Sequence, residues 1–138
     1  MRKKALFFAG GILCLSLAAW AYLLYNKPRK SASLLVTDVT INADSLYACF
    51  NNNEQKANQL YLDKIIAVTG IITEVQESED GFGILLEADR GKPGGIHCTV
   101  DKKQAPFPPV VGNKVTIKGK CTGLLIDVNI ADASLIYK

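Results

Sequence analysis

The sequence predicts a small, mainly β domain with one N-terminal helix: a five-stranded barrel, preceded by a single transmembrane helix. Three observations predict the barrel. The stretch Lys64–Gln76 is apolar and β-branched, alternates with the period of a strand and carries Gly70 near its middle. A second stretch, Val115–Thr122, repeats that pattern around Gly119. Short alternating runs separated by glycine, proline and aspartate turn signals complete the picture, as is typical of small barrels.

The chain begins with a basic leader, residues 1–4, and an apolar stretch without a charge, residues 5–25. That stretch has the length of roughly 20 residues that a helix needs to cross a bilayer. Aromatic residues, which favour the membrane interface, cluster at its far end: Trp20, Tyr22 and Tyr25. Secretory cleavage near Ala21 is the alternative, but the apolar run continues past that point. We therefore expect an uncleaved signal anchor, and a single-pass membrane protein whose domain lies on the non-cytoplasmic, periplasmic side.

Residues 26–43 are expected to form a basic tether followed by an extended lead-in or a short strand. The formal net charge of +3 is segregated, since six of the sixteen basic residues precede residue 31. From there onward ten Lys or Arg residues stand against thirteen Asp or Glu residues, a net charge of −3. Domains that bind nucleic acid by neutralising phosphates carry the opposite sign. The charge therefore counts against nucleic acid as the partner.

The domain itself, residues 44–138, is expected to begin with one helix that runs from about residue 44 to Tyr61. Apolar residues recur there at intervals of three and four, and the opposite face is polar and rich in asparagine. Val75 breaks the alternation of the first strand, which predicts a bulge or a bend. Phe107, in the proline-rich connector after the third strand, is expected to plug one end of the barrel. The five predicted strands occupy residues 64–76, 82–88, 96–101, 114–122 and 128–137.

The two glycine-centred strands are internal copies of one pattern, as expected for neighbouring strands with matching bends. Together with the helix before them, they resemble the tRNA anti-like family of OB-fold domains over roughly residues 45–137. The positions that carry the resemblance are Asn53, Glu54, Ala57, Tyr61, Lys64, Val68, Gly70, Gly112, Val115, Ile117 and Gly119. The resemblance implies an OB-fold-like barrel whose first and fourth strands are neighbours. It also implies an exported or membrane-attached bacterial protein, with no catalytic residues to carry over.

Few residues point to chemistry. His97 is the only histidine, so the sequence indicates neither a histidine-based metal cluster nor a Ser-His-Asp triad, and no cofactor is predicted. Cys98 and Cys121 alternate with apolar strand residues, which favours buried thiols, while a disulfide between them stays open. The candidate ligand-face residues are Phe82, Arg90, Lys92, His97, Lys102 and Lys103.

Two hypotheses about function follow. The first is a membrane-anchored, non-catalytic OB-fold module at the cell envelope that binds a protein, peptide or glycan partner. The second is a single-stranded nucleic-acid-binding OB domain, which requires aromatic residues on the middle strands and basic residues beside them. Phe82, Lys92, Lys102 and Lys103 would supply those contacts. Because this set is small and the domain is acidic, the first hypothesis is favoured.

Overall fold

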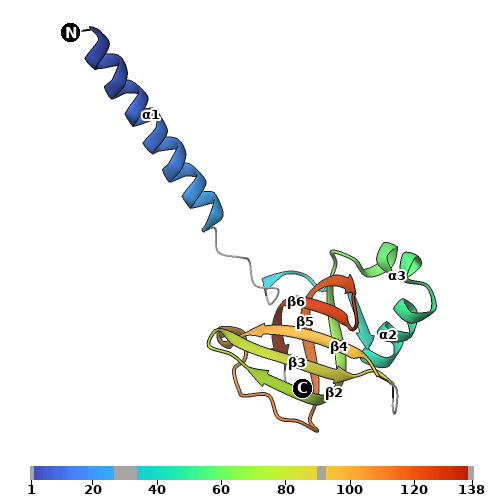
Figure 1. The fold of residues 1–138 in the computed structure, drawn as a ribbon. Helices are drawn as coiled ribbons and strands as arrows, with labels where there is room; N and C mark the ends of the chain where they lie inside the picture. Colours follow the sequence, from blue (N-terminus) through green and yellow to red (C-terminus); the bar gives the residue numbers. More distant parts are fainter. Residues whose placement is uncertain (1, 27–33, 90–92, 137–138) are drawn as a thin grey trace.

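In the computed structural model, which describes residues 2–26, 34–89 and 93–136, five strands close into a barrel (Figure 1). The barrel strands are β2 (Ile65–Glu77), β3 (Gly81–Glu87), β4 (Gly95–Asp101), β5 (Lys114–Leu124) and β6 (Val128–Ile136). Hydrogen-bonded neighbours follow the order β2-β3-β4-β6-β5, and pairing of β2 with β5 closes the circle. β4 and β6 run parallel, whereas the other barrel pairs are antiparallel. The predicted five-stranded OB-fold-like barrel is confirmed.

The two copies of the glycine-centred pattern pair directly with each other. In the β2–β5 ladder Ile66 lies opposite Gly119, Val68 opposite Ile117, and Gly70 opposite Val115. A Cβ atom on Gly119 would lie 2.5 Å from Ile130 Cγ2 and 2.9 Å from the carbonyl oxygen of Ala131, so only glycine fits there. The first and fourth predicted strands are therefore neighbours, as the resemblance implied.

β2 is long enough to serve two neighbours along the same edge. Its first half pairs with β1 (Val39–Asn42), a parallel strand that resolves the open choice between a strand and a lead-in. Its second half pairs with β3, and the register shifts between Ile72 and Glu74. Val75 breaks the alternation of apolar residues in the sequence, and this irregularity is the bulge that the break predicted. β2 thus exchanges one neighbour for the other around Gly70, and this exchange shapes a hollow described below.

The expected single helix over residues 44–61 is wrong, because the segment forms two helices, α2 (Ala43–Asn52) and α3 (Glu54–Tyr61). Asn53 between them has an extended backbone, and its side chain accepts a hydrogen bond of 2.9 Å from the backbone N–H of Lys56. An asparagine that caps the second helix in this way competes with continuation of the first. Both helices still bury their apolar positions on the barrel: Leu46, Phe50 and Ala57.

The core fills the barrel with β-branched and other apolar side chains from all five strands. Cys98 and Cys121 are free thiols within it, which confirms the interpretation as buried thiols. Burial raises the pKa of both thiols. Phe107 is 62% exposed, so the expectation that it plugs the barrel end is wrong. The proline-rich connector instead lies along the outside of the barrel (Figure 1).

α1 (Arg2–Tyr25) is a helix of 24 residues that stands apart from the barrel in Figure 1. The helix expected over residues 5–25 is therefore present, and it extends into the predicted leader, residues 1–4. Within the part of the chain that the structure describes, no helix combines the length and the apolar character of a membrane span. The membrane anchor stays a prediction. Most of the predicted tether, residues 27–33, lies outside the described residues.

Candidate functional site

A shallow groove of about 120 Å³ lies on the outer face of the barrel, where β2, β3 and β4 run side by side. In OB-folds this face and the loops beside it are the surface that takes ligands. We call it the outer-face groove. The six residues that line it are Glu74, Gln76, Gly83, Leu85, His97 and Asp127.

Strand alternation places these side chains on one face. Past the bulge, Glu74 lies opposite Leu85 and Gln76 opposite Gly83, while Leu85 in turn lies opposite His97 on β4. Gly83 lies at the centre of the groove. A Cβ atom there would come within 3.3 Å of His97 Nε2 and 3.7 Å of Gln76 Cβ. The two polar side chains therefore lie close to Gly83 on either side.

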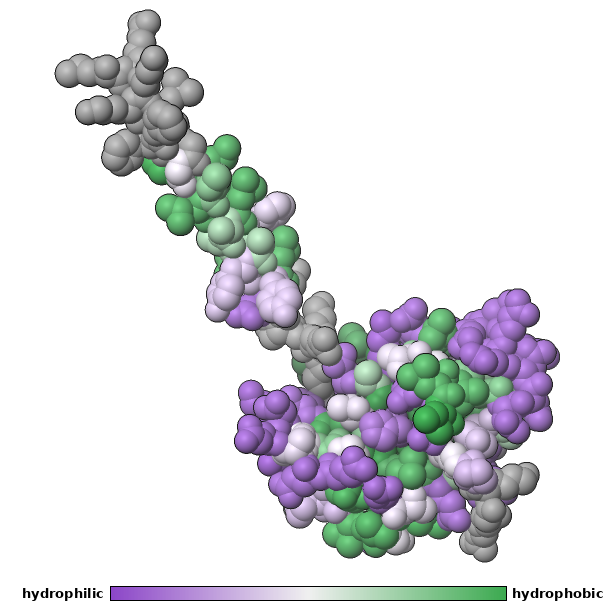
Figure 2. All heavy atoms as spheres, viewed as in Figure 1, coloured by the Kyte–Doolittle hydropathy of each residue, from purple (hydrophilic) through white to green (hydrophobic). Residues whose placement is uncertain are grey.

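The turn between β5 and β6 forms one wall of the groove and is held by Asp127. The Asp127 carboxylate accepts a hydrogen bond of 2.8 Å from the backbone N–H of Gly95, at the start of β4. The backbone carbonyl oxygen of Asp127 accepts a hydrogen bond of 2.9 Å from Asn129 Nδ2. The two residues before it, Leu125 and Ile126, are each 86% exposed at the tip of this turn. We call Leu125 and Ile126 the turn tip; Figure 2 shows that hydrophobic side chains also reach the surface of the barrel elsewhere between polar ones.

The groove is acidic. Glu74 and Asp127 contribute carboxylates, and Gln76 donates a hydrogen bond of 2.8 Å from Nε2 to Glu74 Oε1. None of the described residues that line it is a lysine or an arginine. Glu87 continues the same face of β3 beyond Leu85, because it stands two positions further along the strand. The face therefore attracts cations and repels anions.

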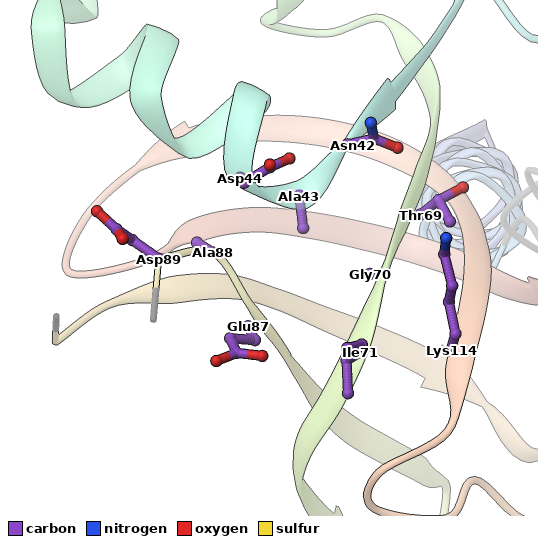
Figure 3. Close-up of a pocket in the computed structure, with 10 residues that line it drawn as sticks. All are labelled: Asn42, Ala43, Asp44, Thr69, Gly70, Ile71, Glu87, Ala88, Asp89 and Lys114. Carbon is purple, nitrogen blue, oxygen red and sulfur yellow. The ribbon is translucent and has the colours of Figure 1, made fainter. Parts of the chain in front are cut away.

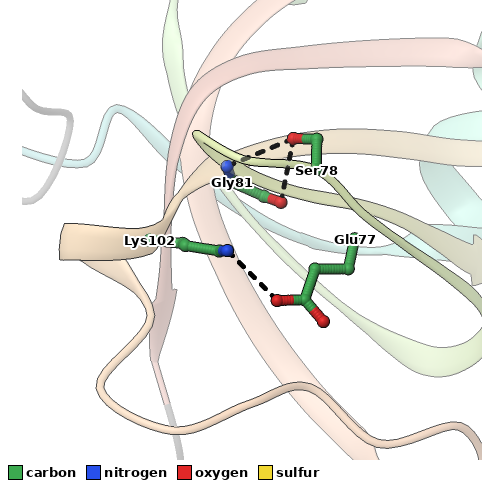
Figure 4. A network of polar contacts seen from close by, with 4 residues as sticks. All are labelled: Glu77, Ser78, Gly81 and Lys102. Atoms are coloured by element: carbon green, nitrogen blue, oxygen red, sulfur yellow. Dashed lines mark hydrogen bonds and ion pairs between the residues drawn. The ribbon is translucent and has the colours of Figure 1, made fainter.

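The predicted ligand-face residues are not gathered at one place. His97 lies in the groove. Phe82 belongs to the inward face of β3, partly buried against the core. Lys102, in the 3-10 helix η2 (Lys102–Gln104), pairs with Glu77 at 3.1 Å (Figure 4). Its Nζ atom also lies 5.9 Å from the centre of the Phe82 ring. Lys103, in the same 3-10 helix, has its backbone N–H bonded to Asp101 Oδ1.

Arg90 and Lys92 lie outside the residues that the structure describes. Of the contacts expected for a nucleic-acid platform, the structure describes Phe82, Lys102 and Lys103. Lys102 lies beside the Phe82 ring, Lys103 follows it in η2, and none of the three lines the outer-face groove. Sequence reasoning missed Glu74, Gln76 and Asp127. The alternation of Glu74 and Gln76 after the bulge was visible in the sequence, but the approach of Asp127 depends on a turn more than fifty residues away.

A second, larger hollow of about 510 Å³ lies where β2 exchanges β1 for β3 (Figure 3). Its floor consists of small residues, Ala43, Gly70 and Ala88. A Cβ atom on Gly70 would come within 2.9 Å of Ala43 Cβ, which shows how closely α2 approaches the bend. The charged residues that line this hollow are of both signs: Asp44, Glu87, Asp89 and Lys114.

Among the residues that the structure describes, no group of three or more His, Cys, Asp or Glu side chains is placed to hold a metal ion. The pKa values that burial shifts belong to core residues away from the groove, such as Cys98. The outer-face groove offers carboxylates, an amide, an imidazole and an apolar rim as groups that can contact a ligand.

A closed five-stranded barrel with this strand order defines an OB-fold-like domain. The sequence model of the tRNA_anti-like family matches residues 1–134, and the chain belongs to that family. No curated protein matches the chain.

Among solved structures, the chain is similar to a "putative nucleic acid-binding lipoprotein" from Klebsiella pneumoniae. The TM-score is 0.54 at 14% sequence identity, over 70% of this chain and 90% of that one. At this identity the likeness supports the fold alone.

Proposed function

We propose that this protein is a non-catalytic binding module at the cell envelope, and that its outer-face groove engages a protein, peptide or glycan partner. The observation that carries the proposal is the groove itself, because it lies on the OB-fold face used for ligands and offers charged, polar and apolar groups for contact. The hydrogen bonds of Asp127 to Gly95 and Asn129 fix the turn beside it, so the wall is preorganised.

The envelope location rests on the N-terminal segment. Residues 5–25 carry no charge, basic residues flank them, and aromatic residues cluster at the end nearer the domain. A single-pass anchor of this kind would hold the barrel on the periplasmic side, close to the membrane. The similar Klebsiella protein is described as a lipoprotein, and this description agrees with a location at the envelope.

The alternative function is binding of single-stranded nucleic acid. It is favoured by the description of the Klebsiella protein as nucleic acid-binding, and by the presence of Lys102 and Lys103 in η2. The charge of the groove argues against it, because Glu74 and Asp127 would repel a phosphate backbone where OB-folds receive it. Lys102 is also engaged with Glu77. The protein, peptide or glycan partner is therefore the better-supported proposal.

Site-specific photo-cross-linking in intact cells tests the proposal. A photoreactive residue replaces Leu85 on the groove floor in one variant of the full-length chain and Lys56, on the exposed side of α3, in a matched control. We expect one discrete adduct from position 85 and none from position 56.

Equal adduct patterns from both positions, or none from position 85, would contradict a binding role for the groove. An adduct at position 85 that nuclease treatment removes would establish the nucleic-acid alternative instead. The cross-link captures a partner of any chemical class and leaves the N-terminal segment intact.

A further inference from the structure

We infer that the partner presents an extended, basic peptide segment to the outer-face groove, with an apolar side chain against the turn tip formed by Leu125 and Ile126. The inference rests on the proposed function, since it names the chemistry of the ligand at that same groove. It uses three properties of the face: its charge, its apolar rim and its strand-like shape.

Charge selects the sign of the partner. Glu74 and Asp127 face the groove, Glu87 extends the acidic surface along β3, and no described lining residue is basic. The region from residue 31 to the C-terminus carries a net charge of −3, so the wider field has the same sign. Lysine or arginine side chains are attracted to such a surface, whereas phosphate or sulfate groups are repelled.

The apolar rim selects a peptide over a simple polycation. Leu125 and Ile126 are each 86% exposed, and they directly precede Asp127, which lines the groove. Leu85, half-buried, adds an apolar patch to the floor between Glu74 and His97. Two exposed aliphatic side chains beside carboxylates complement a ligand that alternates basic and apolar groups. Among the described lining residues, His97 alone offers a ring on which a nucleobase could stack.

The shape of the groove selects an extended backbone. Its floor crosses three adjacent strands, from Gln76 on β2 through Gly83 on β3 to His97 on β4. At the centre, His97 Nε2 approaches Gly83 to within 3.3 Å of where a Cβ atom would stand, so the imidazole is placed to contact a bound ligand. An extended peptide places successive side chains on opposite sides about every 3.3 Å, so one row of side chains can face Glu74 while the other faces the turn tip. A basic side chain there approaches Glu74, and its apolar neighbours can lie towards the turn tip.

The test uses the full-length chain in neutral detergent micelles and a labelled, end-blocked hexapeptide of alternating lysine and valine. Fluorescence anisotropy measures its dissociation constant at 50 mM and 500 mM salt. We expect Glu74→Gln to weaken binding about threefold at low salt, the size expected for an exposed charge pair. The double variant Leu125→Ser/Ile126→Ser should weaken it about tenfold, because it removes the apolar contact. Glu54→Gln, which removes an equal charge from the exposed start of α3, is the matched control and should leave the affinity unchanged.

Several outcomes would overturn the inference. Equal losses in Glu74→Gln and Glu54→Gln would mean that only the overall charge attracts the peptide. Unchanged affinity in the Leu125→Ser/Ile126→Ser variant would exclude the apolar rim. Tighter binding of a neutral hexasaccharide, weakened by Leu85→Ser but not by Glu74→Gln, would replace the peptide by a glycan while the proposed function stands. Absence of binding by the lysine–valine peptide would also overturn it, and the cross-link from position 85 would then decide separately whether the groove binds a partner.

Discussion

Substitution of Gly119 by alanine tests whether the paired glycine strands determine the closure of the barrel. The added Cβ atom would lie 2.5 Å from Ile130 Cγ2, 2.8 Å from Ala133 Cβ and 2.9 Å from the carbonyl oxygen of Ala131. Two of these atoms belong to short, buried side chains and the third to backbone, so none can move cheaply. Overpacking of this kind costs about 3 kcal/mol, and the lost freedom of the unfolded chain returns about 0.5–1 kcal/mol. We therefore expect a net destabilisation of about 2 kcal/mol.

Urea unfolding of the full-length chain in micelles, followed by far-UV circular dichroism, measures this loss. The only tryptophan, Trp20, lies in α1, so its fluorescence would not follow the barrel. Gly83→Ala is the matched control, since its nearest contact is the end of the His97 side chain at 3.3 Å, which can shift. We expect that control to change the free energy of unfolding by less than about 0.7 kcal/mol. Equal effects of the two substitutions would refute the argument that close contact of Gly119 with β6 leaves no space for a side chain.

Three further predictions concern the thiol core, the helix break and the lead-in. Burial raises the pKa of the Cys98 thiol in the folded protein, so the thiol of the unfolded chain loses its proton at a lower pH. The free energy of unfolding therefore falls as the pH rises above about 8.5, and at pH 9.5 it is lower by about 1.4 kcal/mol. Cys98→Ala should remove that part of the alkaline slope in urea midpoints measured from pH 7 to 9.5, and parallel slopes in both proteins would contradict it. Asn53→Ala should cost about 1 kcal/mol through loss of the cap on α3, which thermal unfolding would detect; an unchanged midpoint would mean that the cap is not needed. Lys118→Met should release the carbonyl of Leu35 and speed hydrogen exchange in residues 34–38, and exchange as slow as in the unaltered chain would show that this contact does not hold the lead-in.

The strands could be predicted because period-two alternation and turn residues are local signals. Ile66, Val68 and Ile72 all face the core as the sequence indicated, and the paired copies around Gly70 and Gly119 predicted adjacent strands. The helix break was missed because the apolar stripe continues across it, although Asn53 carried the capping signal. A stripe shows which face is buried, not whether the backbone is continuous.

The candidate site was predicted less well, for a physical reason. His97 lines the outer-face groove, whereas Phe82, predicted for the same ligand face, packs against the core from the other side of β3. A strand's inward face depends on its register with its neighbours, and residues at a strand end give little pattern from which to read it. The groove combines three strands with the turn at Asp127, so it exists only after the barrel closes.

Amide chemical-shift mapping of the full-length chain in micelles, titrated with the lysine–valine hexapeptide, tests the central claim most directly. The claim is that ligands are received by the outer face of β2, β3 and β4 beside the β5–β6 turn. The account predicts saturable shifts concentrated at Gln76, Gly83, His97 and Asp127. Shifts concentrated instead around Gly70 and Lys114, in the hollow at the bend of β2, would contradict it.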